Sequence, residues 1–212
     1  REIEDGDYVD YTYEQIVGTG KILASFLQNE GVKKADRIAI VSENRAQWMM
    51  SYIGAVFCGA MVVPIDANSK QAEIEHILND SETKVLFCSA KQYERIFEIR
   101  NELKKLKKIA NFDLKPNAEN KVKNMISFET AIEIGLKSKF KDVSVDPDDV
   151  AALLYTSGTT GSSKGVMLTH RNLVSNINGL LATVEFNVKD SFLSVLPIHH
   201  TFECTVGFLT AL

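Results

Sequence analysis

A run of small residues in the last third of the chain carries the clearest chemical signal in this sequence. It extends from Thr156 to Gly165 and reads TSGTTGSSKG. Glycines let the backbone fold back and turn N–H groups towards an anion, hydroxyl groups add hydrogen-bond donors, and Lys164 supplies a positive charge. The pattern therefore predicts a loop that holds the phosphates of a polyphosphate ligand.

The alternative for this run is a flexible linker or a plain hairpin turn, because clusters of Gly, Ser and Thr between regular elements are usually loops. The flanking residues favour the phosphate loop. An apolar strand pattern, Val150 to Tyr155, leads directly into the run, and a second short strand pattern, Gly165 to Thr169, follows it. A helix is expected after that from Arg171 to Thr183, capped near Thr169.

The spacing excludes two common nucleotide-binding loops. In a P-loop NTPase the pattern GxxxxGK[ST] precedes a helix, but here the glycines and Lys164 do not fit that spacing and a strand follows the lysine. The dinucleotide fingerprint GxGxxG is also absent. We therefore expect a phosphate loop that joins two strands.

The rest of the chain alternates amphipathic helices with short apolar runs, which is typical of crossover units around a parallel sheet. Helices are expected over residues 13–29, 45–58, 71–80, 92–106 and 128–137. Strands are expected over residues 36–41, 61–64, 84–88 and 108–112. The predicted fold class is α/β, a layered αβα arrangement with a largely parallel sheet, and residues 138–149 are expected to be a connector.

The net charge, the cysteines and the longest charge-free stretch indicate which partners and which cellular compartment to expect. The chain has 212 residues and a net charge of -4, which argues against a mainly electrostatic nucleic-acid binder. Its three widely spaced cysteines indicate reduced core residues in a cytoplasmic protein. The charge-free stretch from Gln47 to Ile65 approaches the length of a membrane span, but Gly54, Gly59 and Pro64 favour a helix followed by a strand, so no transmembrane span is expected.

The segment from Tyr155 to Asn172, YTSGTTGSSKGVMLTHRN, resembles the phosphate-binding signature of the adenylate-forming (AMP-binding) superfamily, which includes acyl-CoA synthetases, peptide-synthetase adenylation domains and luciferases. The segments Asp10–Ile16, Gly31–Asp66 and Leu78–Phe87 are similar to that family in the same order. The later segment Leu196–Glu203, LPIHHTFE, is most like the version in long-chain fatty acid CoA ligases. One departure is Ser163, where the family usually has proline, so the loop is expected to be less rigid.

The resemblance implies a ligase reaction with ATP, Mg²⁺ and coenzyme A. A carboxylic acid, here a long-chain fatty acid, would attack the α-phosphate of ATP to give an acyl-adenylate and pyrophosphate, and coenzyme A would then take the acyl group. Thr156 would also be a ligand of Mg²⁺. The ATP contacts implied by the resemblance are Thr156, Ser157, Gly158, Thr159, Thr160, Gly161 and Lys164.

His200 matches the family's histidine beside the substrate carboxylate and is the implied catalytic residue. Without the resemblance, a histidine pair after LPI would more often be packed at a strand end. His199 is expected to be a wall residue beside the site. The apolar side chains nearby would suit an aliphatic tail or, alternatively, ordinary core packing; they are Phe202, Val206, Phe208 and Leu209.

Residues 1–212 are expected to be the N-terminal portion of an AMP-binding domain, truncated inside an apolar run near Leu212. The isolated chain would then be at most a weak nucleotide binder. Three alternatives remain: a stand-alone, non-catalytic nucleotide-binding module, an adenylating enzyme for a different carboxylic acid, and another class of ATP-using enzyme. A lipid-soluble substrate would be compatible with peripheral membrane contact, and no feature of the sequence predicts the oligomeric state.

Overall fold

The computed structural model describes residues 2–4, 7–116, 124–156, 163–187 and 189–212. Its strands are β1 (Glu2–Glu4), β2 (Asp7–Val9), β3 (Arg37–Val41), β4 (Met61–Ile65), β5 (Val85–Cys88), β6 (Lys108–Asn111), β7 (Met125–Ser127), β8 (Val150–Thr156) and β9 (Lys164–Thr169). Its helices are α1 (Tyr13–Asn29), α2 (Ala46–Phe57), α3 (Gln71–Asp80), α4 (Tyr93–Ile99), α5 (Phe128–Lys137), α6 (His170–Thr183), the short η1 (Ala90–Gln92) and the π-helix η3 (Glu203–Leu209).

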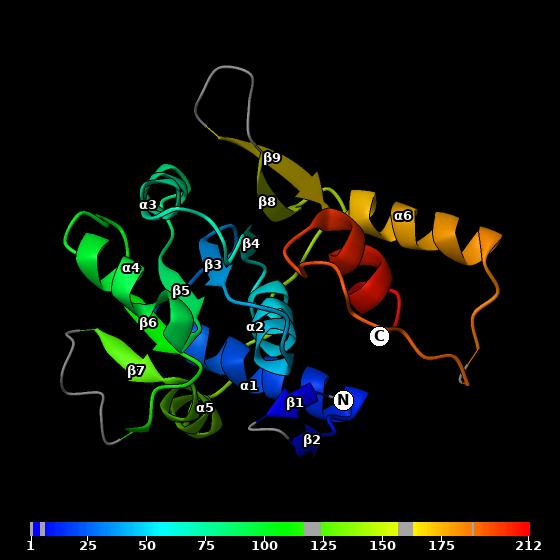
Figure 1. The fold of residues 1–212 in the computed structure, drawn as a ribbon, viewed down its shortest axis with the longest axis horizontal. Coiled ribbons are helices and arrows are strands. Elements are labelled where there is room, and N and C mark those ends of the chain that lie inside the picture. The colour runs from blue at the N-terminus through cyan, green and yellow to red at the C-terminus, as the bar shows by residue number, and fades with distance from the viewer. Residues whose placement is uncertain (1, 5–6, 117–123, 157–162, 188) are drawn as a thin grey trace.

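One seven-stranded sheet organises the molecule, in the order β7-β6-β5-β3-β4-β8-β9 (Figure 1). Every neighbouring pair from β7 to β8 is parallel, and only the last pair, β8 with β9, is antiparallel. The strands β1 and β2 form a separate antiparallel hairpin. The predicted α/β class with a largely parallel sheet is therefore confirmed.

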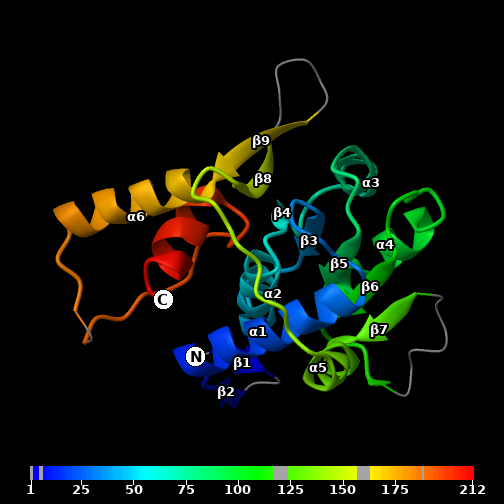
Figure 2. The same cartoon turned by 180° about the vertical axis from the view of Figure 1, so that it is seen from behind.

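Helices cover both faces of this sheet, and each face has its own apolar core (Figures 1 and 2). Successive side chains of a strand point to opposite faces, and β3 shows this clearly. Its Ile38 and Ile40 pack into the core formed with α1, α2 and α5. Its Ala39 and Val41 pack into the core formed with α3 and α4. The sheet is thus the middle of three layers, as the sequence predicts.

Local capping signals explain where several helices begin. Thr12 and Gln15 form a capping box at the start of α1, and Thr169 and Asn172 form another at the start of α6. Ser127 caps α5 by accepting from the Thr130 amide. The predicted bounds of α1, α3 and α5 are confirmed, as is the cap at Thr169.

The prediction for α4 was wrong in length. A helix was expected over residues 92–106, but α4 ends at Ile99. Beyond it the chain turns, so that Leu103 is buried against the α3 side of the sheet and the Lys104 amide donates to the side chain of Asn79 on α3. Tertiary contacts outweigh helix propensity here. The sequence analysis also did not predict β1, β2, β7 or the π-helix η3.

The three cysteines are buried and unpaired, as expected of reduced core residues. Burial raises the pKa of the Cys58 and Cys204 thiols to about 12, and raises that of Cys88 well above its ordinary value.

The charge-free stretch from Gln47 to Ile65 forms most of α2 and all of β4. No helix among the described residues is long and apolar enough to cross a membrane.

The contact between α1 and α5 depends on a glycine. A Cβ atom placed on Gly135 of α5 would lie 2.2 Å from the carbonyl oxygen of Ile22 on α1. That separation is far shorter than a van der Waals contact. Any side chain at this position must therefore force the two helices apart.

We expect Gly135→Ala to lower the free energy of unfolding by roughly 1–3 kcal/mol, the usual cost of overpacking. Gly18→Ala is the matched control, because Gly18 lies exposed inside α1 and a Cβ there meets nothing within 4 Å. That control is expected to stabilise the protein by up to about 1 kcal/mol through higher helix propensity. Urea unfolding followed by circular dichroism measures both, and equal effects of the two substitutions would contradict the packing described.

Candidate functional site

The hairpin of β8 and β9 positions the two described ends of the predicted phosphate loop. Thr156 is the last residue of β8 and is paired directly with Lys164, the first residue of β9. Side chains of directly opposed residues in an antiparallel pair lie on the same face, with Cβ atoms about 4.5–5.5 Å apart. The Thr156 hydroxyl and the Lys164 ammonium group therefore share one face at the mouth of the loop.

The strand-loop-strand arrangement predicted for this region is confirmed, because β9 begins at Lys164 and α6 begins only at His170. Five of the predicted ATP contacts lie outside the described residues. They are Ser157, Gly158, Thr159, Thr160 and Gly161.

Helix α3 anchors the chain on both sides of the loop. The Tyr155 hydroxyl donates to Asp80 Oδ2 at 2.6 Å. On the other side, His76 Nε2 lies 3.0 Å from the carbonyl oxygen of Ser163, and since that oxygen can only accept, Nε2 is the donor. The His76 ring also packs edge-on against Tyr155, with centroids 6.3 Å apart. These contacts hold the mouth of the loop against the body of the protein.

The Tyr155 hydroxyl stays protonated, as its role as a hydrogen-bond donor to Asp80 requires. Burial raises the pKa of its hydroxyl well above the usual value, and the neighbouring Asp80 carboxylate raises it further. The hydroxyl therefore keeps its proton and remains a hydrogen-bond donor at physiological pH. A charge-assisted hydrogen bond of this kind is stronger than one between neutral groups.

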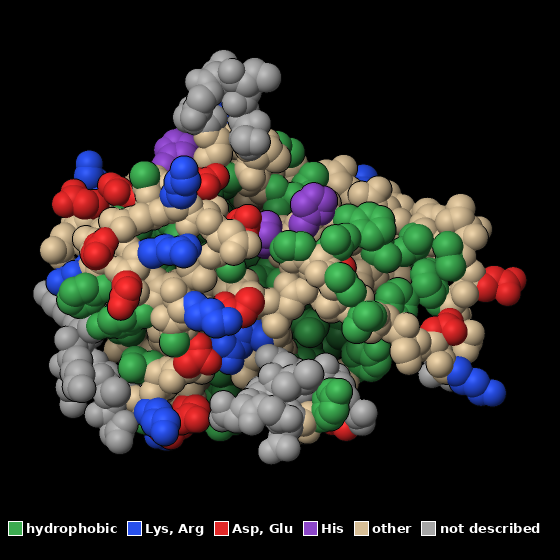
Figure 3. Space-filling model, viewed as in Figure 1, with side chains coloured by type: hydrophobic (Ala, Val, Ile, Leu, Met, Phe, Trp, Pro, Cys, Tyr) green, Lys and Arg blue, Asp and Glu red, His purple; other side chains and the backbone are tan. Residues whose placement is uncertain are grey.

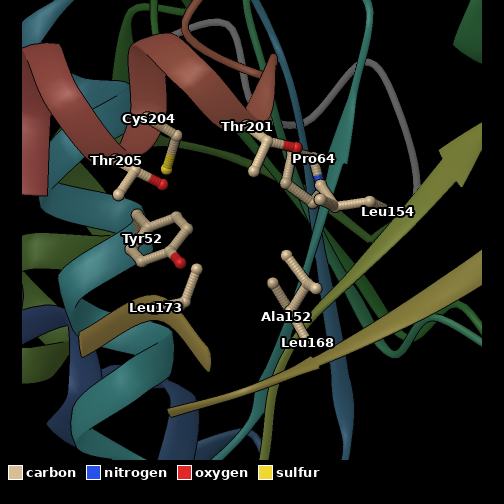
Figure 4. Close-up of a pocket in the computed structure, with 9 residues that line it drawn as sticks. All are labelled: Tyr52, Pro64, Ala152, Leu154, Leu168, Leu173, Thr201, Cys204 and Thr205. Atoms are coloured by element: carbon tan, nitrogen blue, oxygen red, sulfur yellow. The ribbon is translucent and has the colours of Figure 1, made fainter. Parts of the chain in front are cut away.

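The face that carries Thr156 also borders a small apolar cavity (Figure 4). Leu154 and Ala152 lie two and four residues before Thr156 and so point to the same side. The cavity measures about 10 Å³, which is room for about one water molecule. Its lining residues are Tyr52, Pro64, Ala152, Leu154, Leu168, Leu173, Thr201, Cys204 and Thr205. Thr201, the neighbour of His200, lines this cavity together with residues of β8 and β9, so the chain next to His200 lies close to the hairpin.

His200 is exposed, and its geometry leaves one ring nitrogen for a ligand. The Phe202 amide donates to His200 Nδ1 at 3.4 Å, a long contact in which Nδ1 is the acceptor. The carbonyl oxygen of His200 accepts from the Cys204 amide at 3.0 Å, where the chain enters η3. A π-helix is rare and is often found at functional sites. The apolar pattern of these residues did not predict it.

His199 is oriented differently from His200. Its Nε2 lies 3.9 Å from Asp66 Oδ2 at the end of β4. Burial lowers the pKa of His199, although the Asp66 carboxylate opposes this shift. His199 therefore lies against the body of the protein, where the sequence analysis expected a wall residue.

The apolar residues considered for an acyl tail are placed in different environments. Phe208 is buried in the α2 side of the core, with its ring 6.1 Å from Trp48 and 5.7 Å from Tyr52. Phe202 is 58% exposed. Phe208 is therefore a core residue, whereas Phe202 is exposed to solvent. Val206 and Leu209 are half-buried.

One oxygen donor at the mouth of the loop could take part in binding Mg²⁺. Among the residues with described positions, no group of three or more His, Cys, Asp or Glu side chains could enclose a metal ion. Mg²⁺ at nucleotide sites is usually held by one or two protein oxygens together with phosphates and water. The hydroxyl of Thr156 is one hard oxygen donor at the mouth of the loop, and phosphate oxygens and water would have to supply the other ligands of such an ion.

The whole chain, residues 1–212, matches the family described as "AMP-binding enzyme". The chain belongs to the AMP-binding enzyme family. This membership agrees with the family resemblance carried by residues 155–172 and 196–203, and with the strand-loop-strand geometry of β8 and β9.

Among its relatives in this family, the chain is 33% identical to fatty acyl-CoA synthetase A of Dictyostelium discoideum, over 95% of this chain and 31% of that protein. It is 32% identical to luciferin 4-monooxygenase of Photuris pensylvanica, over 93% of this chain and 38% of that protein. It is 30% identical to a long-chain-fatty-acid–CoA ligase of Escherichia coli O6:H1, over 93% of this chain and 39% of that protein. The chain thus spans less than two fifths of the length of these relatives.

Solved structures of AMP-binding enzymes share the fold. The anthranilate CoA ligase AuaEII in complex with anthranoyl-AMP matches with a TM-score of 0.86 at 23% identity, covering 95% of this chain and 38% of that one. ATP-bound MatB from Rhodopseudomonas palustris matches with a TM-score of 0.75 at 26% identity, covering 94% of this chain and 37% of that one.

We expect Tyr155→Phe to lower the free energy of unfolding by about 1 kcal/mol, because it removes the hydrogen bond to Asp80 and leaves the ring in place. The melting temperature should fall by roughly 2–4 °C. Tyr13→Phe, at an exposed position on α1, is the control and should change neither value. Calorimetry measures both variants, and indistinguishable melting temperatures would contradict the anchoring of the loop by α3.

Proposed function

We propose that the protein containing this chain is an ATP-dependent acyl-CoA synthetase. In the first step a carboxylate oxygen bonds to the α-phosphorus of ATP, the bond to the β-phosphate oxygen breaks, and pyrophosphate leaves. In the second step the thiolate of coenzyme A attacks the acyl carbonyl and AMP leaves. The observation that carries this proposal is the pairing of Thr156 with Lys164 at the mouth of the TSGTTGSSK loop in a member of the AMP-binding family.

Lys164 would contact the β- and γ-phosphates of ATP, together with the backbone amides and hydroxyls of residues 157–161. Its charge would stabilise the negative charge that accumulates on the departing pyrophosphate. The Thr156 hydroxyl would hold Mg²⁺, which when bound neutralises part of that charge. Since both side chains share one face of the hairpin, they would reach the same end of the nucleotide.

His200 would act on the carboxylic acid. Its exposed Nε2–H can donate a hydrogen bond to one carboxylate oxygen and so orient the other towards the α-phosphorus. An Nδ1 that accepts from the Phe202 amide is compatible with this donation from Nε2. His199, turned towards Asp66, would take no direct part.

The substrate class that we propose is a long-chain fatty acid. The segment LPIHHTFE and the fatty acyl-CoA synthetases among the relatives support this choice. The chain covers 31–39% of those relatives, so we infer that residues 1–212 are the N-terminal part of the catalytic domain. The reaction would need the complete protein. The three unpaired, buried cysteines are compatible with the cytoplasmic location that we propose.

The test is carboxylate-dependent ATP–pyrophosphate exchange by the full-length protein, with acids from acetate to palmitate and with benzoate. We expect exchange to peak with long acyl chains and to fall about 100-fold or more in Lys164→Ala, as when a transition-state donor is removed. Lys137→Ala, an exposed charge on α5, is the matched control and should retain full exchange.

Each result of this series distinguishes the alternatives. A peak with an aryl or short acid would keep the adenylation reaction and replace the substrate class. No exchange with any acid, in a protein that still binds ATP, would contradict the ligase and leave a nucleotide-binding module.

A further inference from the structure

A single asparagine at the carboxyl end of β3 holds the segment that leads to the two histidines. Asn44 Nδ2 donates to Ser194 Oγ at 2.8 Å and to the Leu196 carbonyl oxygen at 2.7 Å. Its Oδ1 accepts from the Ile198 amide at 2.8 Å. These residues are about 150 positions apart in sequence. The Asn44 side chain therefore binds the backbone on both sides of Pro197, at the Leu196 carbonyl oxygen and at the Ile198 amide.

The loop that carries Asn44 is itself firmly held. On one side, Glu43 accepts a hydrogen bond from Ser89 Oγ at 2.7 Å and pairs with Lys91 at 3.0 Å. On the other side, Arg45 pairs with Asp113 at 2.8 Å. These partners follow β5 and β6, so the neighbours of Asn44 are tied to two further strands of the sheet. A side chain supported in this way is well placed to fix the position of another segment.

In the segment that Asn44 holds, residues 194–197 are exposed and Ile198 alone is buried. Leu193 is 85% exposed and Val195 is 72% exposed, so neither side chain fixes the chain by packing. Figure 3 shows apolar side chains gathered on this side of the molecule, over α6 and the residues that follow it. In the part of the chain that the structure describes, the hydrogen bonds between residues 194–198 and the rest of the fold involve Asn44, apart from the turn in which the His200 amide donates to the Pro197 carbonyl oxygen.

The position of His200 follows from that of the held segment. Ile198 is buried in the core, and the His200 amide donates to the Pro197 carbonyl oxygen at 2.9 Å. One tight turn thus separates the residues bound by Asn44 from the imidazole ring. A shift of the backbone at Leu196 or Ile198 must therefore move the ring.

We propose that Asn44 is a positioning residue, which fixes the segment 194–198 and thereby places His200 for the reaction. Its effect on catalysis rests on the proposed function, whereas the anchoring itself does not. Displacement of a reacting group by about 1 Å can cost on the order of 100-fold in rate. The loss of Asn44 should therefore lower turnover without weakening the contacts of the phosphate loop.

The anchoring is tested by hydrogen–deuterium exchange of the full-length protein, read by mass spectrometry. In Asn44→Ala we expect peptides covering residues 194–202 to exchange at least about tenfold faster, because the Ile198 amide loses its acceptor. Peptides from β5 should be unchanged. Asn101→Ala, at an exposed position after α4, is the matched control. Unchanged exchange over residues 194–202 would overturn the proposal whatever the activity.

The catalytic consequence is tested in the pyrophosphate-exchange assay. We expect Asn44→Ala to lower kcat by about 10- to 100-fold with the KM for ATP changed less than about twofold. Asn44→Asp keeps an acceptor for the Ile198 amide but turns a carboxylate oxygen towards the Leu196 carbonyl oxygen, so it should not restore the kcat of the wild type. In a His200→Ala background, adding Asn44→Ala should cost little more, because both changes disturb one unit.

A full additional loss in that background, or a raised KM for ATP with unchanged kcat, would overturn the positioning role. If the wild-type protein shows no exchange with any acid, the proposed function fails. Hydrogen–deuterium exchange alone then decides whether Asn44 holds the segment. Failure of the anchor and failure of the function are thus distinguishable.

Discussion

The antiparallel pairing of β8 with β9 is the constraint on which the rest of the site depends. Hydrogen bonds between these strands set a register in which Thr156 lies opposite Lys164. The register determines which side chains share a face, and a shift of one residue would send one of the two to the opposite face. Through the Val62–Ala152 pair, β8 is also joined to the parallel part of the sheet. The mouth of the loop is therefore part of the sheet.

Further contacts then bring distant parts of the chain to this hairpin. Helix α3, which covers one face of the sheet, holds Tyr155 and Ser163 on the two sides of the loop. The loop after β3 holds the segment before His200. Ligands of open α/β folds usually bind outside the carboxyl ends of the strands. At that edge, Asn44 after β3 and Asp66 after β4 contact the segment of residues 194–200. Two packed cores give these contacts a rigid base.

Much of this arrangement could be predicted from the sequence because its signals are local. The strands on both sides of the proposed phosphate loop were predicted from their apolar runs, and the start of α6 was predicted from the cap at Thr169. The parallel sheet followed from the alternation of apolar runs and amphipathic helices. The overlong prediction for α4 shows the limit of this approach, because the chain leaves the helix at Ile99 to bury Leu103, and no local pattern encodes that contact.

The residues that support the site could not be predicted either, because their contacts join segments that are far apart in sequence. Asp80 and Tyr155 are 75 positions apart, and Asn44 and Ile198 are 154 positions apart. Asp80 and Asn44 are ordinary polar residues in their own segments, and their contacts arise only when the sheet brings the segments together. His199 and His200 are adjacent in sequence, yet they have different surroundings: His199 lies near Asp66, and His200 accepts from the Phe202 amide.

The central claim is that the β8–β9 hairpin presents Lys164 to the β- and γ-phosphates of a nucleotide. It is tested most directly by measuring the affinities of the full-length protein for ATP and for AMP by calorimetry, in the wild type and in Lys164→Ala. The account predicts that the wild type binds ATP more tightly than AMP and that Lys164→Ala removes most of this preference while affinity for AMP is retained. An equal preference for ATP in both proteins would contradict the account.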